Sequence, residues 1–339
     1  MLQRHSSPRL CDDWYPDPPR LPLAASTNLN PAGDGLRTHG MNSPHSPPTT
    51  TLARRRWLTL LGLAPLLQAC SPFRLINATV PSNTHTVLRG EAYGNAERQR
   101  MDVYLPVDKT PDAPMAVFFY GGSWSSGERA DYRFVGEALA SRGIVTVVAD
   151  YRLSPDVRYP VFLQDCALAV RWARDNARRL GASPSRLFVT GHSAGAYNAA
   201  MLALDARWLA EVSMRASELA GWAGLAGPYD FLPIALPEVQ VAFNWPDTPA
   251  SSQPLFHARA GTGLKHRVLL LAARNDTAVN PQRNTLAMAQ ALQQRGTSVE
   301  LELLDRVNHV TLIGAMAPPL RGLAPVLDRF SSFLLQPPT

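Results

Sequence analysis

The stretch GHSAG at residues 191–195 follows the apolar run RLFVT at 186–190 and precedes the helix-favouring segment 194–204. A G-x-S-x-G turn between a strand and a helix is typical of a nucleophile elbow, which exposes its serine at the carboxyl end of the strand. Glycines flank the serine because so tight a turn leaves no room for side chains. The pattern predicts that Ser193 is a nucleophile. The alternative is a serine N-cap at an ordinary strand–helix connection.

A second glycine turn lies upstream. The apolar run MAVFF at 115–119 predicts a buried strand, and it leads directly into YGGSW at 120–124. A glycine pair at a strand end lets the backbone direct its N–H groups into a cavity, where they can stabilise an oxyanion. The candidate donors are Gly122 and Ala194, with Gly121 and Ser123 as further candidates. The alternative is a plain glycine turn with Trp124 packed as a core aromatic.

A candidate acid and a candidate base follow two further predicted strands. The apolar segment 266–273 leads to Asp276, and the alternating segment 298–304 leads to His309. The chain order Ser193, Asp276, His309 is that of one type of Ser-His-Asp hydrolase. Asp276 is alternatively a turn residue before a helix that starts near Pro281, and Asp305 is then the next candidate acid.

The strand predictions alternate with helix predictions. Helices are expected over 134–140 and 163–180, with a strand over 144–148 between them. This β-α-β rhythm predicts an α/β fold, with a mostly parallel central sheet and helices on both faces.

The segment 93–335 resembles the α/β-hydrolase superfamily. Within it, the chain resembles bacterial carboxylesterases of the bifunctional feruloyl and acetyl-xylan esterase-like type, and more distantly hormone-sensitive-lipase-like esterases and kynurenine formamidases. The resemblance rests on Asp276, His309 and the motifs MDVYLP (101–106), YGGSW (120–124), DYRLSP (150–155), GHSAG (191–195) and GPYD (227–230). It implies a structural role for Asp150. Tyr120 departs from the family, whose loop commonly has a histidine there.

These features predict a serine carboxylesterase that hydrolyses short-chain or aryl esters through an acyl-enzyme and needs no cofactor. The alternatives are an aryl formamidase of the kynurenine formamidase type and a non-catalytic binding lipoprotein with the same fold. The substrate pocket is expected to be lined by aromatic residues, most of them from the segment between the elbow helix and the acid: Trp124, Tyr229, Phe231, Phe243 and Trp245.

The N-terminal part has a different character. Residues 1–50 are rich in Pro, Ser, Asn and Thr and are predicted to be disordered. Residues 51–70 combine three arginines, an apolar run and Ala69-Cys70, which predicts a signal peptide with a lipid attached at Cys70. The alternative is a buried or amphipathic helix at the domain edge. We expect translation to start at Met41. The expected product is an exported lipoprotein of the Gram-negative periplasm or cell envelope. Residues 71–92 are interpreted as a linker with the first strand, and 93–337 as the catalytic domain.

Composition agrees with one ordinary α/β domain, at 45% hydrophobic and 18% charged residues. The formal net charge of +6 does not predict nucleic-acid binding, because the arginines fall in the leader and on scattered helix faces. The expected partners are a small ester and, through Cys70, a membrane; no oligomeric state is predicted. Cys166 is expected to be a buried core thiol, and the sequence contains no metal-ligand pattern.

Overall fold

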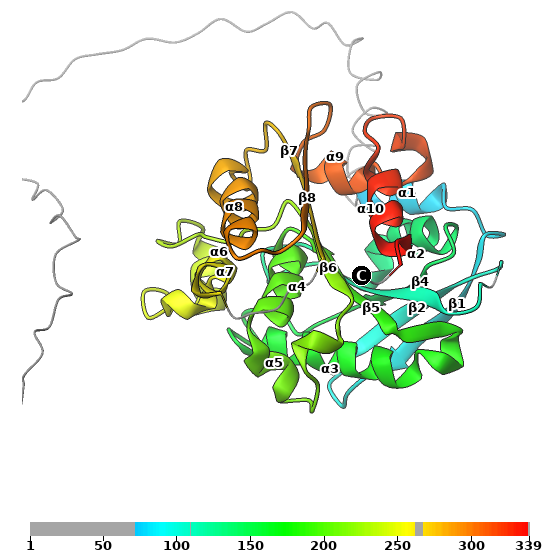
Figure 1. Ribbon diagram of the computed structural model, residues 1–339, viewed down its shortest axis with the longest axis horizontal. Helices are drawn as coiled ribbons and strands as arrows, with labels where there is room; N and C mark the ends of the chain where they lie inside the picture. The colour runs from blue at the N-terminus through cyan, green and yellow to red at the C-terminus, as the bar shows by residue number, and fades with distance from the viewer. Residues whose placement is uncertain (1–71, 109, 262–266, 338–339) are drawn as a thin grey trace, which may run out of the picture. The chain divides into compact units, whose positions relative to one another are not determined.

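The computed structural model (Figure 1) describes residues 72–108, 110–261 and 267–337. The predicted disordered extension 1–50, the predicted leader 51–70 and the predicted lipid attachment at Cys70 lie outside these residues. Across the described ranges, no helix combines the length and the apolar character needed to cross a membrane.

The described chain forms an eight-stranded sheet in the order β1-β2-β4-β3-β5-β6-β7-β8. The first two pairings, β1 with β2 and β2 with β4, are antiparallel, and all the others are parallel. The strands are β1 (His85–Ala92), β2 (Arg100–Pro106), β3 (Ala113–Phe119), β4 (Val145–Ala149), β5 (Ala182–His192), β6 (Gly221–Leu225), β7 (Arg267–Ala273) and β8 (Val299–Leu304).

The central strands are buried on both faces. Every residue of β3, β4, β6 and β7 is buried, as expected for parallel strands covered by helices on each side. The edge strands β1 and β8 instead contain exposed positions. In register, Phe119 at the end of β3 pairs with Gly191 of β5. This pairing places the loop that follows β3 beside the turn that follows β5.

Helices cover both faces of the sheet. Helices α2 and α10 lie together against one face, and α3, α4 and α8 lie against the other (Figure 1). The helices are α1 (Pro72–Ala78), α2 (Arg133–Ala140), α3 (Val161–Asn176), α4 (Ala194–Leu204), α5 (Ala206–Ala210), α6 (Pro237–Phe243), α7 (Pro254–Ala260), α8 (Ala287–Gln294), α9 (His309–Gly314) and α10 (Val326–Leu335). A π-helical turn at Gln282–Leu286 leads into α8.

The predicted fold class is confirmed, and α4 has the predicted bounds. The helix predicted over 163–180 was too long, because α3 ends at Asn176 and a 3₁₀ turn follows. Gly181 closes that turn in a left-handed conformation, with φ of 81°, which stops helical continuation. Cys166 is a free, buried thiol within α3, as predicted.

Candidate active site

The turn between β5 and α4 holds Ser193 in a strained backbone conformation, with φ of 53° and ψ of −123°. Its N–H donates a 2.9 Å hydrogen bond to the carbonyl of Leu225 in β6. A Cβ on Gly195 would lie 1.9 Å from the carbonyl oxygen of Phe119, and one on Gly191 would lie 2.3 Å from Gly195. Only glycine fits at both positions, so the two glycines allow the serine to stand at the tip of the turn.

The structure brings Ser193, His309 and Asp276 together. His309 Nε2 lies 2.9 Å from Ser193 Oγ, and His309 Nδ1 lies 2.7 Å from Asp276 Oδ2. An ionised carboxylate only accepts hydrogen bonds, so Nδ1 carries the proton and Nε2 is free to accept from the serine hydroxyl. The three residues follow β5, β8 and β7, whose carboxyl ends meet at one edge of the parallel sheet.

Asp276 is buried and held by its surroundings in the ionised form. Burial alone favours the neutral acid, but hydrogen bonds from His309 and from the backbone N–H groups of Val279 and Ala278 outweigh it and lower the pKa. The Ala278 N–H donates to Asp276 Oδ1 at 2.8 Å, and the Val279 N–H donates to the same atom at 2.9 Å. The alternative acid, Asp305, instead pairs with Arg274, and its side chain is 70% exposed.

The base is fixed by a helix cap that sequence reasoning missed. His309 is the first residue of α9, and Asn308 Oδ1 accepts from the N–H groups of Val310 and Thr311. In the reciprocal hydrogen bond, Thr311 Oγ1 accepts from the Asn308 N–H. The spacing of Asn308 and Thr311 is the detectable signal of this capping box.

The loop after β3 presents N–H groups beside the serine. Gly122, Ser123 and Trp124 have positive φ values of 130°, 51° and 57°, and a Cβ on Gly122 would lie 2.3 Å from the Ser126 carbonyl oxygen. Within the described residues, the N–H groups of Gly122 and Ala194 have no hydrogen-bond acceptor. Both residues line the same cavity as Ser193, so their N–H groups are available to a bound oxygen.

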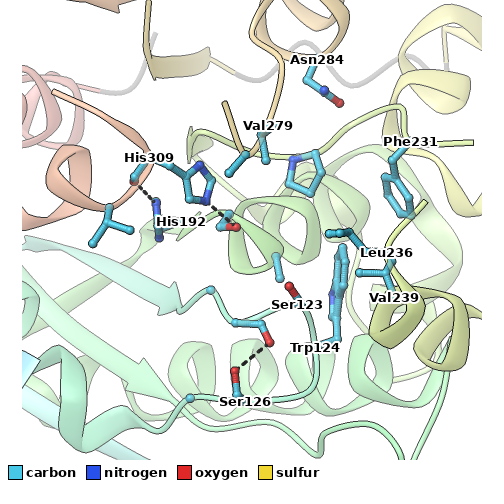
Figure 2. Close-up of a pocket in the computed structure, with 18 of the residues that line it drawn as sticks. Ser123, Trp124, Ser126, His192, Phe231, Leu236, Val239, Val279, Asn284 and His309 are labelled. Carbon is cyan, nitrogen blue, oxygen red and sulfur yellow. Dashed lines mark hydrogen bonds between the residues drawn. The ribbon is translucent and has the colours of Figure 1, made fainter. Parts of the chain in front are cut away.

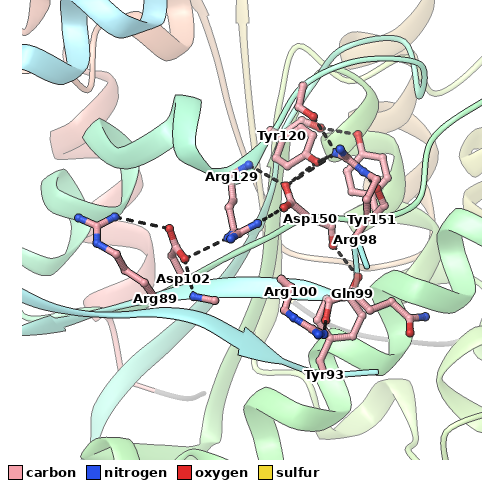
Figure 3. Close-up of polar contacts among 12 residues, drawn as sticks. Arg89, Tyr93, Arg98, Gln99, Arg100, Asp102, Tyr120, Arg129, Asp150 and Tyr151 are labelled. Atoms are coloured by element: carbon pink, nitrogen blue, oxygen red, sulfur yellow. Dashed lines mark hydrogen bonds and ion pairs between the residues drawn. The ribbon is translucent and has the colours of Figure 1, made fainter. Parts of the chain in front are cut away.

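A buried polar network supports this loop (Figure 3). The Tyr120 phenol donates to Asp150 Oδ1 at 2.8 Å and accepts from Arg98 at 2.8 Å. Asp150 also accepts from the backbone N–H of Arg129 at 2.7 Å and from its guanidinium. Tyr151 donates to the Tyr120 carbonyl at 2.8 Å. Asp150 therefore lies in a structural network, as the resemblance implied, and Tyr120 occupies the position of the family histidine within it.

The cavity beside Ser193 has a volume of about 720 Å³ (Figure 2). All four predicted oxyanion residues line it: Gly121, Gly122, Ser123 and Ala194. Of the predicted pocket aromatics, Trp124 and Phe231 line it. The other apolar lining residues are Phe73, Tyr132, Pro228, Pro233, Ile234, Ala235, Leu236, Val239, Ala278, Val279 and Val310, and the polar ones include Asp131, His192, Asp230, Asn280, Arg283 and Asn284.

Tyr229, Phe243 and Trp245 do not line the cavity, so their predicted place was wrong. Tyr229 is fully buried against Trp222, with ring centroids 6.0 Å apart. Phe243 lies behind the wall, 4.7 Å from Trp124 and 5.1 Å from Phe231 between ring centroids. Trp245 packs against the core. Their aromatic character therefore reflects burial behind the wall rather than contact with a ligand.

One wall comes from outside the predicted catalytic segment. Phe73 of α1 lines the cavity and lies 5.2 Å from the ring of Tyr132. The Asn77 amide donates to the carbonyls of Ala130 and Asp131 at 2.9 and 3.0 Å and accepts from the Phe134 N–H. The contacts of Phe73 and Asn77 together hold α1 beside the site.

Across the described ranges, no group of three or more His, Cys, Asp or Glu side chains is arranged to hold a metal ion. The chemistry that the arrangement offers is nucleophilic attack by Ser193, with a paired base and free backbone N–H donors beside it.

In sequence, the chain is similar to known esterases and to a formamidase. The BD-FAE family model matches residues 101–239. A probable isoprenylcysteine alpha-carbonyl methylesterase of Oryza sativa subsp. japonica is 28% identical over 258 residues, covering 70% of this chain and 59% of the relative. The kynurenine formamidase of Danio rerio is 26% identical over 224 residues, covering 65% of this chain and 74% of the formamidase. The chain thus spans about 60% of the length of the plant relative.

Solved structures agree on the fold. An esterase from Pyrobaculum calidifontis has a TM-score of 0.62 at 20% identity, covering 78% of this chain and 90% of that chain. The expected α/β-hydrolase fold and the resemblance to these esterases are therefore confirmed.

Proposed function

We propose that this chain, an α/β-hydrolase with a BD-FAE segment, is a serine carboxylesterase for short-chain or aryl esters. One observation carries the proposal: Asp276, His309 and Ser193 form a continuous chain of hydrogen bonds that ends beside the free N–H groups of Gly122 and Ala194. A non-catalytic binding protein would not need this arrangement.

The geometry supports a two-step reaction. Ser193 Oγ attacks the ester carbonyl while His309 Nε2 takes its proton, and Asp276 stabilises the resulting imidazolium. The N–H groups of Gly122 and Ala194 bind the oxyanion. His309 then gives the proton to the leaving alcohol, which departs and leaves an acyl-enzyme. Water, activated by the same histidine, releases the acid.

The cavity supports a compact ester. Trp124, Phe231 and Val239 line its apolar side, the rings of Trp124 and Phe231 lie 5.7 Å apart between centroids, and Phe243 packs behind both rings. Such a wall buries a short acyl chain or an aromatic ring, and a long chain meets buried side chains instead. An aryl formamide is the second candidate substrate, because the kynurenine formamidase relative aligns over 65% of this chain.

Localisation belongs to the same proposal. The arginine cluster, the short apolar run and Ala69-Cys70 support export and lipid attachment at Cys70. Mass spectrometry of the membrane fraction tests this: a diacylglyceryl-modified Cys70 at the mature N-terminus is expected. An unmodified Cys70 inside an intact exported chain contradicts the lipid anchor without affecting the catalytic proposal.

A substrate panel tests the activity. The purified full chain is assayed with p-nitrophenyl acetate and butyrate, methyl ferulate, acetylated xylan and N-formylkynurenine, beside Ser193→Ala. The wild type should turn over the small esters, and the variant should lose on the order of 10⁶ in kcat, as in subtilisin. Turnover of N-formylkynurenine alone would favour the formamidase, and a Ser193→Ala variant with more than a few per cent of the activity would overturn the serine mechanism.

A further inference from the structure

His192 stands beside the nucleophile and reaches the base. It ends β5, is only 5% exposed, and its Nε2 lies 2.9 Å from the backbone carbonyl oxygen of His309. The two imidazole rings lie 4.9 Å apart between centroids. Figure 2 marks the hydrogen bond between the His192 ring and the His309 carbonyl. A carbonyl only accepts hydrogen bonds, so His192 Nε2 carries the proton and donates a hydrogen bond to the His309 carbonyl.

The other nitrogen of the ring then has no proton. His192 Nδ1 is buried and has no hydrogen-bond partner within the described residues. An unpaired buried acceptor destabilises a folded protein. A leucine of similar size would avoid this penalty, so packing alone does not explain an imidazole at this position.

The His192 ring also lies beside the loop after β3, which carries Gly121 and Gly122 and is called the oxyanion loop below. A Cβ on Gly121 would lie 3.3 Å from His192 Nδ1 and 2.9 Å from the Cβ of Ser193. His192 is therefore bonded covalently to the nucleophile, packed against the loop that carries Gly122, and hydrogen-bonded to the residue that bears the base. These are the three parts whose relative placement decides the reaction geometry.

We infer that His192 is a positioning residue, whose Nε2–H holds the main chain of His309 at the distance from Ser193 that proton transfer needs. The inference rests on the proposed function and deepens it. His192 lines the cavity, but its one hydrogen bond within the described residues is to the His309 carbonyl, so it acts through His309.

Three full-chain variants test the inference. His192→Leu removes the donor but keeps the volume. His192→Gln keeps a side-chain N–H that can reach the same carbonyl. Thr190→Val is the matched control, because Thr190 is also buried in β5. The substitution removes the hydrogen bond from the Thr190 hydroxyl to the Val117 carbonyl, which lies away from the site.

The three variants are expected to differ in kcat. His192→Leu should lower kcat for p-nitrophenyl acetate between about tenfold and a hundredfold, because small displacements of catalytic groups have effects of that size. KM and the thermal unfolding midpoint should stay near wild type. His192→Gln should recover most of the loss, and Thr190→Val should leave kcat unchanged within about twofold.

Two results would overturn the inference: full kcat in His192→Leu, or equal losses in the leucine and glutamine variants. A crystal structure of His192→Leu provides a readout that needs no turnover. His309 Nε2 should lie beyond hydrogen-bonding distance, about 3.5 Å, from Ser193 Oγ, and an unchanged distance also overturns the inference. If instead the wild type hydrolyses nothing while the displacement is seen, only the proposed function fails.

Discussion

The phenol of Tyr120 donates a 2.8 Å hydrogen bond to the carboxylate of Asp150. Tyr120 opens the loop that carries Gly121 and Gly122, and Arg98 donates to the same phenol. The network therefore fixes the point at which the loop that carries Gly122 leaves β3.

We expect Tyr120→Phe to lower kcat about tenfold, because a hydrogen bond to a charged group is worth about 1.5–3 kcal/mol and its loss loosens the loop. Tyr104→Phe is the matched control, since the buried Tyr104 phenol has no hydrogen-bond partner in the described chain. Steady-state kinetics and thermal unfolding of both variants check this. Equal kcat values for the two variants would show that the loop does not depend on Asp150.

The identity of the acid can be tested by two matched substitutions. Asp276→Asn should lower kcat by about 10⁴ with the fold intact, because the amide disturbs the tautomer of His309. Asp305→Asn should have little effect, since its exposed pair with Arg274 contributes at most about 1 kcal/mol. Circular dichroism controls for folding, and the reverse order of losses would move the acid to Asp305.

Acyl-chain preference should depend on Phe231. We expect kcat/KM of the wild type to be highest with acetyl to butyryl esters, because each methylene gains about 0.8 kcal/mol only while the cavity can bury it. Phe231→Ala opens the wall and should move the optimum to longer chains. Phe256→Ala is the control, as Phe256 is 47% exposed on α7 and does not line the cavity. A wild-type optimum at octanoyl or longer contradicts the proposed preference for short acyl groups.

Stability in acid should reveal the neutral state of His192. Burial and the neighbouring His309 lower the His192 pKa to about 3, against 6.5 for the free side chain. Between these values the unfolded chain binds the extra proton and the folded chain does not, so stability falls as pH drops below 6.5. From pH 7 to pH 5 this one group should remove about 2 kcal/mol.

Urea unfolding of the wild type and His192→Gln at both pH values isolates this contribution. On going from pH 7 to pH 5, the free energy of unfolding of the wild type should fall by about 2 kcal/mol more than that of His192→Gln. A difference that does not vary with pH would mean that His192 titrates normally in the folded protein.

The sheet and the placement of Ser193, Asp276 and His309 were within reach of the sequence. Apolar runs mark buried parallel strands, and residues just past their ends must gather at one edge of the sheet. The cavity wall was not predictable in the same way. Tyr229 and Phe243 look like ligand contacts in sequence, but an aromatic residue in a loop packs inward as readily as it faces a cavity.

The support around the loop was also beyond the sequence. Arg98 and Arg129 reach Asp150 from separate segments, and no spacing rule connects them to Tyr120. The tautomer of His192 likewise depends on the carbonyl of a residue more than a hundred positions away.

The docking of α1 has a practical meaning for protein production. Motif boundaries suggest trimming the gene to the first strand, at His85, and the resulting polypeptide would contain every residue of the triad and the oxyanion loop. It would nevertheless lack Phe73 and the Asn77 amide that secures the turn at Ala130 and Asp131. We expect the trimmed protein to lose this part of the cavity wall and to differ in substrate selectivity for that reason alone. Kinetic comparisons should therefore use protein that retains Pro72 onward.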